Sequence, residues 1–550
     1  MNTTSNPRVE REFSVRAVVC GILIGLLLMA MMMYLDGVLG LDTDVAPIAS
    51  TIGIFLIPLI GGPTNRKEVN IMQTTATAVT FSAYSLTGNY VPMLMMGEEF
   101  RLLQAIVVLM LSNAIGICFV TLLRDQYVFD ESLPFPGAVM CKTALDQVDD
   151  VKSSSAKMLI IAALLSMVVS FLQNFEILPC LFDFTTILPE GMTLSVLILP
   201  LMLGMGYVLG SRICLFMTGA CLLVCLVESP LGYNQGLFEN PAEDYSFIQN
   251  YNLPVVIGMS LFAALIPLFK QRKAFIATFR LGKNTKENVS DRNYSIKGVV
   301  VLLAVLEILM IIFCAVFYEV SVFPMIICNV LSLIFAMIAV RVFAESGLSA
   351  GMALNLFMIL IAYALTKNAM FALLMAFTNF NTFVLAQDTM VDLKVGQIVK
   401  SSPLKQIKAQ YIGIVCGSIV GACLFYGILQ TFGLESDFFF YPFGRMYYSV
   451  ADGLATNGLE GAFDMVRFLI GGGLGTLFSL IGLPTGAIAL AFYLAPKTIL
   501  GLAVGGFIRF LIEKIKGEEN AVKLETVATG MVVGDAMACV IMVIVTMFIF

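Results

Sequence analysis

Polar residues recur at helical spacing in one otherwise apolar stretch of the chain. The stripe holds Asn70, Gln73, Thr77, Thr80 and Tyr84, whose offsets of 0, 3, 7, 10 and 14 place them on one face of an α-helix. Amides, hydroxyls and a phenol on one face can hold a zwitterionic or polyamide substrate without a large net charge. Since unsatisfied polar groups are costly in hydrocarbon, we expect the stripe either to line a pore or to hydrogen-bond neighbouring helices.

A second stripe brings two carboxylates onto a helical face. Thr378 and Asn381 precede Asp388 and Asp392 at the same spacing, and the two acids lie one helical turn apart. Two close carboxylates interact strongly and can share a proton near neutral pH. We expect either a proton-coupling site in which Lys394 neutralises one acid, or a helix end at the membrane surface with a solvated ion pair.

Three further acids lie inside or beside apolar runs. Glu68 begins the first stripe, Glu345 marks a Glu-Ser-Gly-Leu-Ser break, and Asp535 lies within the last apolar run. A carboxylate in hydrocarbon is a candidate functional group. Glu68 and Glu345 also stand near arginines, so a structural ion pair fits them equally well. The candidate substrate-binding residues are Asn70, Gln73, Thr77, Tyr84 and Asn381, and the candidate proton-coupling residues are Asp388, Asp392, Glu68, Glu345 and Asp535.

The residue types present argue against several classes of function. The chain has no His, which is the commonest metal ligand and proton relay, and its 12 Cys form no CxxC pair. No nucleotide-binding GxxxxGK loop occurs, and no nucleophile–base pair stands out. The net charge of -6 lacks the basic footprint of a nucleic-acid-binding protein. We therefore expect no cofactor, no bound metal, no nucleic-acid partner and no enzymatic activity.

Long apolar runs must position these residues. Hydrophobic residues make up 59% of the 550 and charged residues only 13%, whereas soluble domains are about 25% charged. Counting uncharged segments of bilayer-spanning or half-spanning length gives roughly 14–16 helices. We predict an all-α, polytopic membrane protein, with the bilayer as its main surroundings. The clearest uncharged runs are 45–64, 69–97, 102–123, 191–211, 245–269, 368–387, 409–434 and 468–496.

Loop charges predict the orientation of the chain. Arg8, Arg11 and Arg16 precede the first apolar run, so the positive-inside rule places the N-terminus in the cytoplasm. The next turn, 36–44, carries three Asp and no base, and is expected outside. Segment 270–297 holds eight Lys or Arg against two acids and is expected to be the main cytoplasmic loop, or a solvated linker without a regulatory role.

The basic segment 270–297 divides the chain into an N-terminal membrane half, 1–269, and a C-terminal half, 298–550. A weak repeat links them, because Val-Lys-Ser-Ser begins at both Val151 and Val399 ahead of an apolar helix. Parallel copies with a site between them are a common transporter plan. Four matching residues also arise by chance, so the repeat is a hypothesis.

Glycines crowd one stretch of the C-terminal half. Gly471 to Gly473 and Gly475 are followed by Gly482 and Pro484. Such residues can break a membrane helix around a substrate, and they can equally allow close packing of two helices.

Four segments, taken in order, resemble the oligopeptide transporter family, which includes yellow stripe-like carriers of metal chelates. They span about 60–500 of the chain. One departure is Val69, where the family commonly has Asn. The segments are Glu68-Val69-Asn70 with Gln73-Thr74; Leu133-Pro134-Phe135-Pro136-Gly137; Asp388 with Asp392-Leu393-Lys394 and Gly396, followed by Pro403 and Gln406; and Leu483-Pro484 with Tyr493 and Pro496.

The resemblance implies about sixteen membrane helices and cation-coupled symport, usually with protons, of small peptides, glutathione-like compounds or metal chelates. Because this chain lacks His, any proton relay must use carboxylates. A sodium-coupled carrier or a channel for another small solute is the alternative, and a membrane enzyme is a third. The inner membrane is expected if the protein is bacterial. The sequence does not decide the substrate or the oligomeric state.

Overall fold

The computed structural model describes most of the chain as helix, with one short hairpin of strands β1 (Leu181–Asp183) and β2 (Ser195–Leu197) among the described residues. The prediction of an all-α polytopic protein is confirmed. The described residues are 12–40, 45–131, 133, 135–145, 154–242, 245–270, 294–346, 349, 351–436, 439–461 and 464–549.

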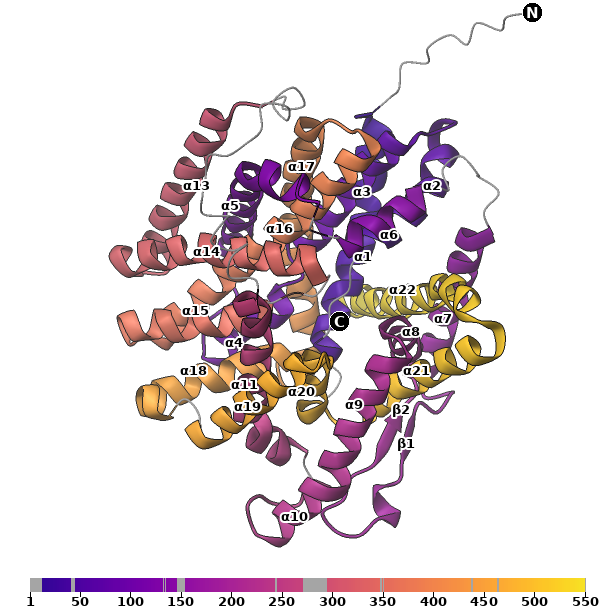
Figure 1. Ribbon diagram of the computed structural model, residues 1–550, viewed down its shortest axis with the longest axis vertical. Coiled ribbons are helices and arrows are strands. Elements are labelled where there is room, and N and C mark those ends of the chain that lie inside the picture. The colour runs from indigo at the N-terminus through magenta and orange to yellow at the C-terminus, as the bar shows by residue number, and fades with distance from the viewer. Residues whose placement is uncertain are drawn as a thin grey trace, which may run out of the picture.

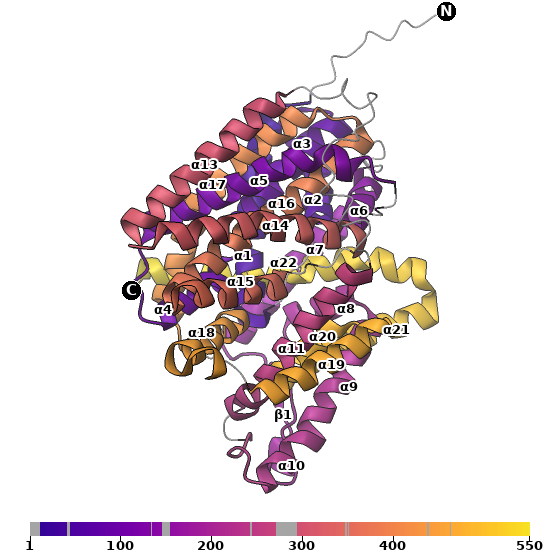
Figure 2. The same cartoon turned by 60° about the vertical axis from the view of Figure 1, so that its left-hand side comes forward.

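The helices form two bundles, one above the other in Figures 1 and 2. The first bundle is built around α16 and α3. It contains α1 (Val15–Leu39), α2 (Ala46–Gly61), α3 (Arg66–Phe81), the π-helix η1 (Leu86–Tyr90), α4 (Val91–Met95), α5 (Leu102–Val128), α6 (Pro136–Leu145), α13 (Ile296–Phe317), α14 (Val322–Ser346), α15 (Gly351–Thr366), α16 (Ala369–Val399), α17 (Pro403–Phe432) and α18 (Pro442–Gly461).

The second bundle forms through contacts of α22 with α7 and α8, of α11 with α19, and of α21 with α8 and α9. The β-hairpin and α10 project from its end (Figure 1). It contains α7 (Ser154–Asn174), the 3-10 turn η3 (Thr185–Ile187), α8 (Pro200–Leu209), α9 (Ser211–Leu223), the π-helix η4 (Val224–Glu228), α10 (Ser229–Asn234), α11 (Ser246–Lys270), α19 (Met465–Leu480), α20 (Thr485–Tyr493), α21 (Pro496–Lys516) and α22 (Glu518–Ile549).

Both halves of the sequence contribute to both bundles. In each half of the sequence, the helices that come first join the first bundle and those that follow join the second. Parallel copies would produce this order, so the repeat remains a reasonable hypothesis. Residues 271–293, which make up most of the predicted cytoplasmic loop, lie outside the described residues.

Seven spans within the described chain are long and apolar enough to cross a membrane: α1, α5, the continuous α9–η4–α10 segment, α13, α14, α16 and α17. Their burial differs greatly. The apolar window of α16 is 89% buried inside the protein, whereas that of α13 is 11% buried. Hence α16 forms the centre of the first bundle and α13 presents its side chains to lipid.

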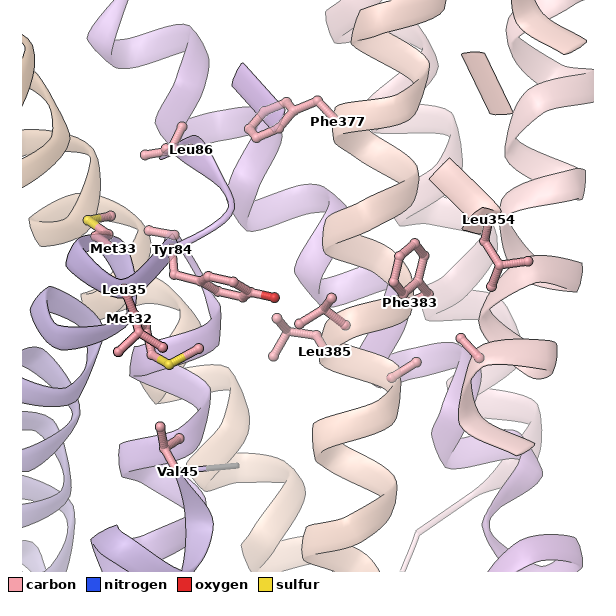
Figure 3. Packing of buried hydrophobic residues seen from close by; sticks show 14 of the residues in the cluster. Met32, Met33, Leu35, Val45, Tyr84, Leu86, Leu354, Phe377, Phe383 and Leu385 are labelled. Atoms are coloured by element: carbon pink, nitrogen blue, oxygen red, sulfur yellow. The ribbon is translucent and has the colours of Figure 1, made fainter. Parts of the chain in front are cut away.

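Apolar side chains from α1, α3, η1 and α16 fill the centre of this bundle. Figure 3 shows Met32, Leu86, Phe377 and Leu385 within one cluster of fully buried residues. Lipid tails are as apolar as these side chains, so in a membrane the cluster stabilises the fold chiefly through close van der Waals packing.

Glycines bring α3 very close to its neighbours. A Cβ atom added at Gly25 of α1 would lie 2.6 Å from the carbonyl oxygen of Ala76, and one at Gly417 of α17 would lie 2.4 Å from that of Val79. Real Cβ atoms do not approach backbone oxygens this closely. The polar helix α3 is therefore held between two backbones with little freedom to shift.

The glycine-rich stretch of the C-terminal half allows close packing of α19 against α11. Gly471 and Gly475 lie in the continuous helix α19, where an added Cβ would meet the backbone of α11 at 2.1 and 2.5 Å. A break does occur beyond them, because residues 481–484 separate α19 from α20.

Candidate functional site

The polar stripe of α3 meets the acidic stripe of α16 in the interior of the first bundle. Asn70, Gln73, Thr77 and Asp392 are all fully buried. The Gln73 amide donates a hydrogen bond to Oδ1 of Asp392, and the Thr77 hydroxyl donates to Oδ2 at 2.9 Å. The structure thus brings together residues that are more than 300 positions apart.

Helix α17 completes the cluster with two glutamines one turn apart. Nε2 of Gln410 donates to Oδ2 of Asp392 at 2.7 Å and to Oδ2 of Asp388 at 3.3 Å. Nε2 of Gln406 donates to Oδ1 of Asn70 at 3.1 Å and to the backbone oxygen of Asp392 at 2.6 Å. The Asp392 network is therefore shared by three helices, and it consists of Asn70, Gln73, Thr77, Asp388, Asp392, Gln406 and Gln410.

Local sequence explains how α17 reaches this position. Helix α16 ends at Lys400 in a left-handed conformation (φ 58°), and Pro403 opens α17. At Gly396 an added Cβ would lie 2.0 Å from Oε1 of Gln406. Glycine is thus required there for the Gln406 amide to lie against α16, which accounts for the spacing of Asp392, Gly396, Pro403 and Gln406.

Two expectations about the acids of α16 are wrong. Helix α16 continues to Val399, so Asp388 and Asp392 do not lie at a solvated helix end; they are 7% and 0% exposed. Lys394 does not neutralise either acid, because its Nζ donates to the backbone oxygen of Val128 at 2.6 Å, at the C-terminal end of α5. The Lys394 ammonium group thus binds a terminal carbonyl of α5 and not a carboxylate of α16.

The membrane segment that begins with α3 is broken after Phe81. Residues 82–85 form turns, and the π-helix η1 leads into the short α4. The break places the hydroxyl of Ser85 2.6 Å from Oδ1 of Asn381, to which it donates. Irregular backbone at membrane depth is tolerated where it is buried in protein, and single-turn π-helices often mark functional sites.

A chain of amides continues along the π-helix. Nδ2 of Asn355 on α15 donates to Oδ1 of Asn89, and Nδ2 of Asn379 donates to Oδ1 of Asn355 at 3.3 Å. All three side chains are buried. Polar groups therefore extend along α16 from Asp392 through Asn381 to Asn379.

Tyr84 lies after the break in this segment, and its ring faces α16. Its ring packs edge-to-face on Phe81 and Phe380, with centroids 5.6 and 6.0 Å away, and Figure 3 shows it beside Leu385. Tyr84 thus lies beyond the regular part of α3, which ends at Phe81. Its assignment to substrate binding remains a prediction, as do those of Asn70, Gln73, Thr77 and Asn381.

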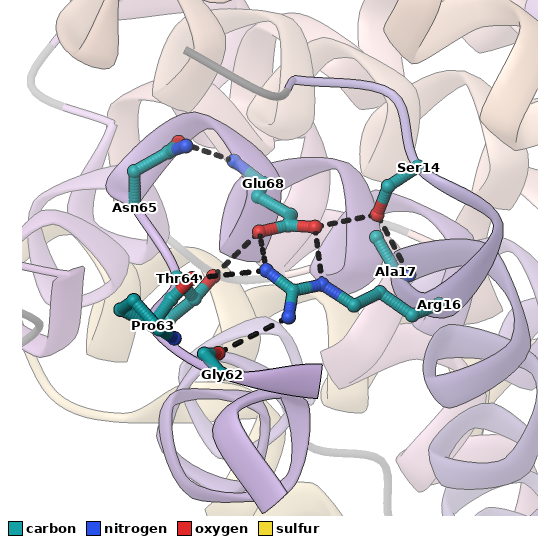
Figure 4. Close-up of polar contacts among 8 residues, drawn as sticks. All are labelled: Ser14, Arg16, Ala17, Gly62, Pro63, Thr64, Asn65 and Glu68. Carbon is teal, nitrogen blue, oxygen red and sulfur yellow. Dashed lines mark hydrogen bonds and ion pairs between the residues drawn. The ribbon is translucent and has the colours of Figure 1, made fainter. Parts of the chain in front are cut away.

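Glu68 forms a bidentate ion pair at the start of α3 (Figure 4). The Arg16 guanidinium donates to its two carboxylate oxygens at 2.8 and 2.7 Å, and the hydroxyls of Ser14 and Thr64 donate to them as well. Arg16 also donates to the backbone oxygens of Gly62 and Pro63. The ion pair and its hydrogen bonds join the beginnings of α1 and α3, in agreement with the prediction of a structural ion pair at Glu68. The role of Glu68 in proton coupling remains a prediction.

Of the other two predicted acids, Asp535 lies apart from the network. Asp535 is buried in the second bundle, where its Oδ2 accepts a hydrogen bond from the backbone N–H of Leu201 at 2.8 Å and so caps α8. Glu345 lies near the end of α14, and its side chain is outside the described residues.

One acid that the sequence placed in an external turn is a buried helix residue. Asp36 belongs to the last turn of α1, and its carboxylate accepts a hydrogen bond from the Thr87 hydroxyl at 2.6 Å. It therefore joins the buried polar groups around the π-helix. The remainder of that expected acidic turn, 41–44, lies outside the described residues.

A cavity of about 380 Å³ opens at the far end of α16. Three connections surround it: 96–101 between α4 and α5, 318–321 between α13 and α14, and 367–368 between α15 and α16. It is lined by Glu98, Arg101, Phe317, Tyr318, Glu319, Val320, Ser321, Thr366, Asn368, Met370, Phe371 and Leu374.

The cavity and the Asp392 network occupy opposite ends of one helix. Asn368 caps α16 at the cavity, and Asp392 lies 24 residues further along. At 1.5 Å per residue this is about 36 Å, comparable with the thickness of the hydrocarbon core. The protein thus has an open chamber near one face of the expected bilayer and a closed polar cluster near the other.

Sequence reasoning missed several of these polar groups. Gln410 could have been identified from the sequence, because it lies in an uncharged run one helical turn after Gln406. Asn89, Asn355 and Asn379 show no common spacing, since they come from three different elements. Their association depends on the break after Phe81, which helical periodicity does not reveal.

The chain matches the model of the OPT oligopeptide transporter protein family over residues 12–546. A putative oligopeptide transporter of Haemophilus influenzae is 24% identical, with 86% of each chain aligned. A probable metal-nicotianamine transporter, YSL8 of Arabidopsis thaliana, is 29% identical over 27% of this chain and 23% of its own. The iron-phytosiderophore transporter yellow stripe 1 of Zea mays is 26% identical over 32% of this chain and 28% of its own.

The two plant relatives therefore align with less than a third of their own length, whereas the bacterial relative and the family model align with most of this chain. Together with the apolar spans described above, these matches identify an integral, multi-pass membrane protein. The chain belongs to the OPT oligopeptide transporter family.

Proposed function

We propose that this protein is a secondary active transporter that carries small peptides or peptide-like metal chelates together with protons, and that it has no enzymatic activity. The substrate class is supported by the printed functions of the relatives, which include oligopeptide and metal-nicotianamine transporters. The proton is supported by the geometry of the Asp392 network.

The observation that carries the proposal is the position of Asp392. Its carboxylate is fully buried and accepts hydrogen bonds from Gln73, Thr77 and Gln410, which belong to two other helices. An ionised carboxylate only accepts, whereas a protonated one also donates. Gain or loss of a proton therefore changes which hydrogen bonds α16 can make with α3 and α17.

Buried oxygens that lack partners make both protonation states possible. Oε1 of Gln406 and Oε1 of Gln410 have no hydrogen bond within the described structure. If its amide flips, the Gln410 oxygen can accept the proton of a neutral Asp392. The same amide donates when the acid is ionised, so the two protonation states differ in the hydrogen bonds between α16 and α17.

A sodium-coupled carrier is the second candidate, and the same oxygens favour it. The hydroxyl oxygen of Thr74 is also buried without a partner. Carboxylate, amide and hydroxyl oxygens are suitable ligands for a hard cation, and unwound helices coordinate sodium in other transporters. The two candidates differ in whether transport depends on a proton or a sodium gradient.

We place the Asp392 network near the cytoplasmic face and the cavity near the opposite face. Loop charges support this orientation, because Arg16, Arg66 and Lys405 lie at the helix ends nearest the network. Lys405 pairs with Glu12 at 2.7 Å, so the starts of α1 and α17 are on one side. In a bacterial cell the protein is expected in the inner membrane.

The test is uptake by proteoliposomes under an imposed proton gradient, with Asp392→Asn as the variant. A mixed tri- to pentapeptide pool and iron chelates serve as substrates, and Asp183→Asn in the exposed β-hairpin is the matched control. We expect proton-driven uptake that falls at least about 100-fold in Asp392→Asn, since a buried charged partner is lost, and that is unchanged in the control. Uptake that follows sodium and ignores the proton gradient contradicts proton coupling.

A further inference from the structure

The cavity at the far end of α16 carries charges of both signs. Glu98 and Arg101 come from the connection between α4 and α5, and Glu319 comes from the connection between α13 and α14. Among the described residues these three side chains make no ion pair. Elsewhere in the described structure Arg16 pairs with Glu68 and Arg509 with Glu513.

Two phenol hydroxyls lie beneath these charges without hydrogen bonds. Tyr90 is fully buried, and its hydroxyl lies near that of Tyr318 and near the Arg101 backbone, but without the geometry of a full hydrogen bond. The hydroxyl of Tyr318, which lines the cavity, also lacks a partner in the described structure. Leaving a buried hydroxyl unpaired is unfavourable, so such a group commonly accepts a hydrogen bond from, or donates one to, a ligand or water.

From these features we propose that the cavity binds a zwitterionic ligand of the small free peptide class, with its ammonium group at Glu98 and Glu319 and its carboxylate at Arg101. The inference rests on the proposed transport function and adds the place and the charges of first recognition. Arg suits this role because its planar guanidinium can hold a carboxylate through two hydrogen bonds.

The size and the walls of the cavity fit this ligand class. Its volume of about 380 Å³ falls in the ~300–1,000 Å³ range of small-molecule sites. Phe317, Met370, Phe371 and Leu374 form an apolar wall that can receive peptide side chains of varied shape. Met and aromatic residues adapt to different partners, and the charges fix only the two ends.

An aromatic layer closes the cavity toward the Asp392 network. The ring of Tyr90 contacts those of Phe100 and Phe377 edge-to-face at 5.3 and 5.2 Å, and Phe100 in turn contacts Phe425 at 5.3 Å. A ligand in the cavity therefore cannot reach Asp392 in this conformation. Binding at the cavity can be measured without any transport step.

The absence of Trp from the chain permits a clean binding experiment. Phe317→Trp places a single fluorophore at the cavity, and Phe510→Trp on the exposed face of α21 serves as a remote control. Purified protein in nanodiscs is titrated with trialanine, with its N-acetyl derivative and with its C-terminal amide. Calorimetry on the unsubstituted protein repeats the titrations without any reporter.

The proposal predicts a specific pattern among variants. Arg101→Gln weakens trialanine binding about tenfold but leaves binding of the C-terminal amide unchanged. Glu98→Gln weakens trialanine binding about tenfold but leaves binding of the N-acetylated peptide unchanged. Each variant loses one charge-assisted hydrogen bond to the peptide. Glu99→Gln, next to Glu98 but outside the lining, has no effect. The copper(II) complex of triglycine, whose amino group is bound to the metal, binds at least tenfold more weakly than the free peptide.

Equal binding of charged and blocked peptides, or binding that ignores Glu98 and Arg101, overturns the proposal. Preferential binding of the copper complex also overturns it and favours a chelate as the ligand. None of these outcomes depends on a gradient. Uptake that requires Asp392 while the cavity ignores peptide charge would leave the proposed function standing and remove only this inference.

Discussion

The two ends of α16 differ in how their polar groups are satisfied. At one end Glu98, Arg101 and Glu319 border a cavity of about 380 Å³ and make no ion pair in the described structure. At the other end Asp392 is fully buried and is held by donors from α3 and α17. The difference indicates a division of labour, in which one end meets a ligand from water and the other responds to a small cation.

Helix packing reinforces this contrast. Around the network, glycines of α1 and α17 leave α3 almost no space, so a change at Asp392 must be transmitted to those helices. Around the cavity, part of the wall consists of connections between helices, which move more easily than packed helix interiors. The Asp392 network and the cavity are therefore expected to respond differently to substitution.

The largest effect is expected at Gln410, which donates to both acids of α16. Gln410→Leu removes these hydrogen bonds and leaves a buried carboxylate under-solvated, so proton-driven uptake should fall about 30- to 100-fold. Peptide binding at the cavity should change less than about twofold. Gln430→Leu, on an exposed face of the same helix, is the matched control, and a similar loss there would show that α17 tolerates no such change.

Glu68 should matter for stability and not for the coupling ion. Glu68→Gln leaves Arg16 without its bidentate partner, which should lower the free energy of unfolding by about 2–3 kcal/mol. The thermal midpoint of the purified protein measures this change. Adding Arg16→Gln should recover part of the loss in a double-mutant cycle. Uptake that becomes independent of the proton gradient in Glu68→Gln would instead assign Glu68 to coupling.

Gly396 should be a sensitive position beside the network. Gly396→Ala forces the Gln406 amide away from α16, which should cost about 1–3 kcal/mol of stability through overpacking and reduce uptake as well. Gly473→Ala, where nothing lies within 4 Å of the added Cβ, is the control in thermal unfolding. Equal midpoints for the two variants would contradict the close contact between α16 and α17.

The smallest effect is expected from Asp535, because it caps α8 in the second bundle and lies apart from both ends of α16. Asp535→Asn keeps a side-chain oxygen that can accept from the Leu201 backbone. Uptake should therefore change less than about threefold, with the same dependence on pH. A loss comparable with that of Gln410→Leu would place a coupling site in the second bundle.

Helical spacing predicted much of the network, because local periodicity survives wherever a helix stays regular. Asn70, Gln73 and Thr77 lie on one face of α3, and Asp392 lies within α16. The spacing did not reveal the break after Phe81, so Tyr84 lies outside the regular helix that periodicity assumes.

Long-range pairing was beyond the reach of the sequence alone. Lys394 is two residues from Asp392, yet it binds the carbonyl of Val128, because residues two apart on a helix do not face each other. Asp36 was assigned to a turn from its acidic neighbours, although α1 continues past it. Charge patterns do not show where an apolar helix ends.

The central claim is that the Asp392 network couples proton movement to transport. The most direct measurement is proton flux into proteoliposomes that contain a pH-sensitive dye, after a peptide is added outside without any imposed gradient. Peptide entry through the unsubstituted protein should acidify the interior, and Asp392→Asn should give no acidification. Peptide accumulation without proton movement, or acidification that persists in Asp392→Asn, would contradict the claim.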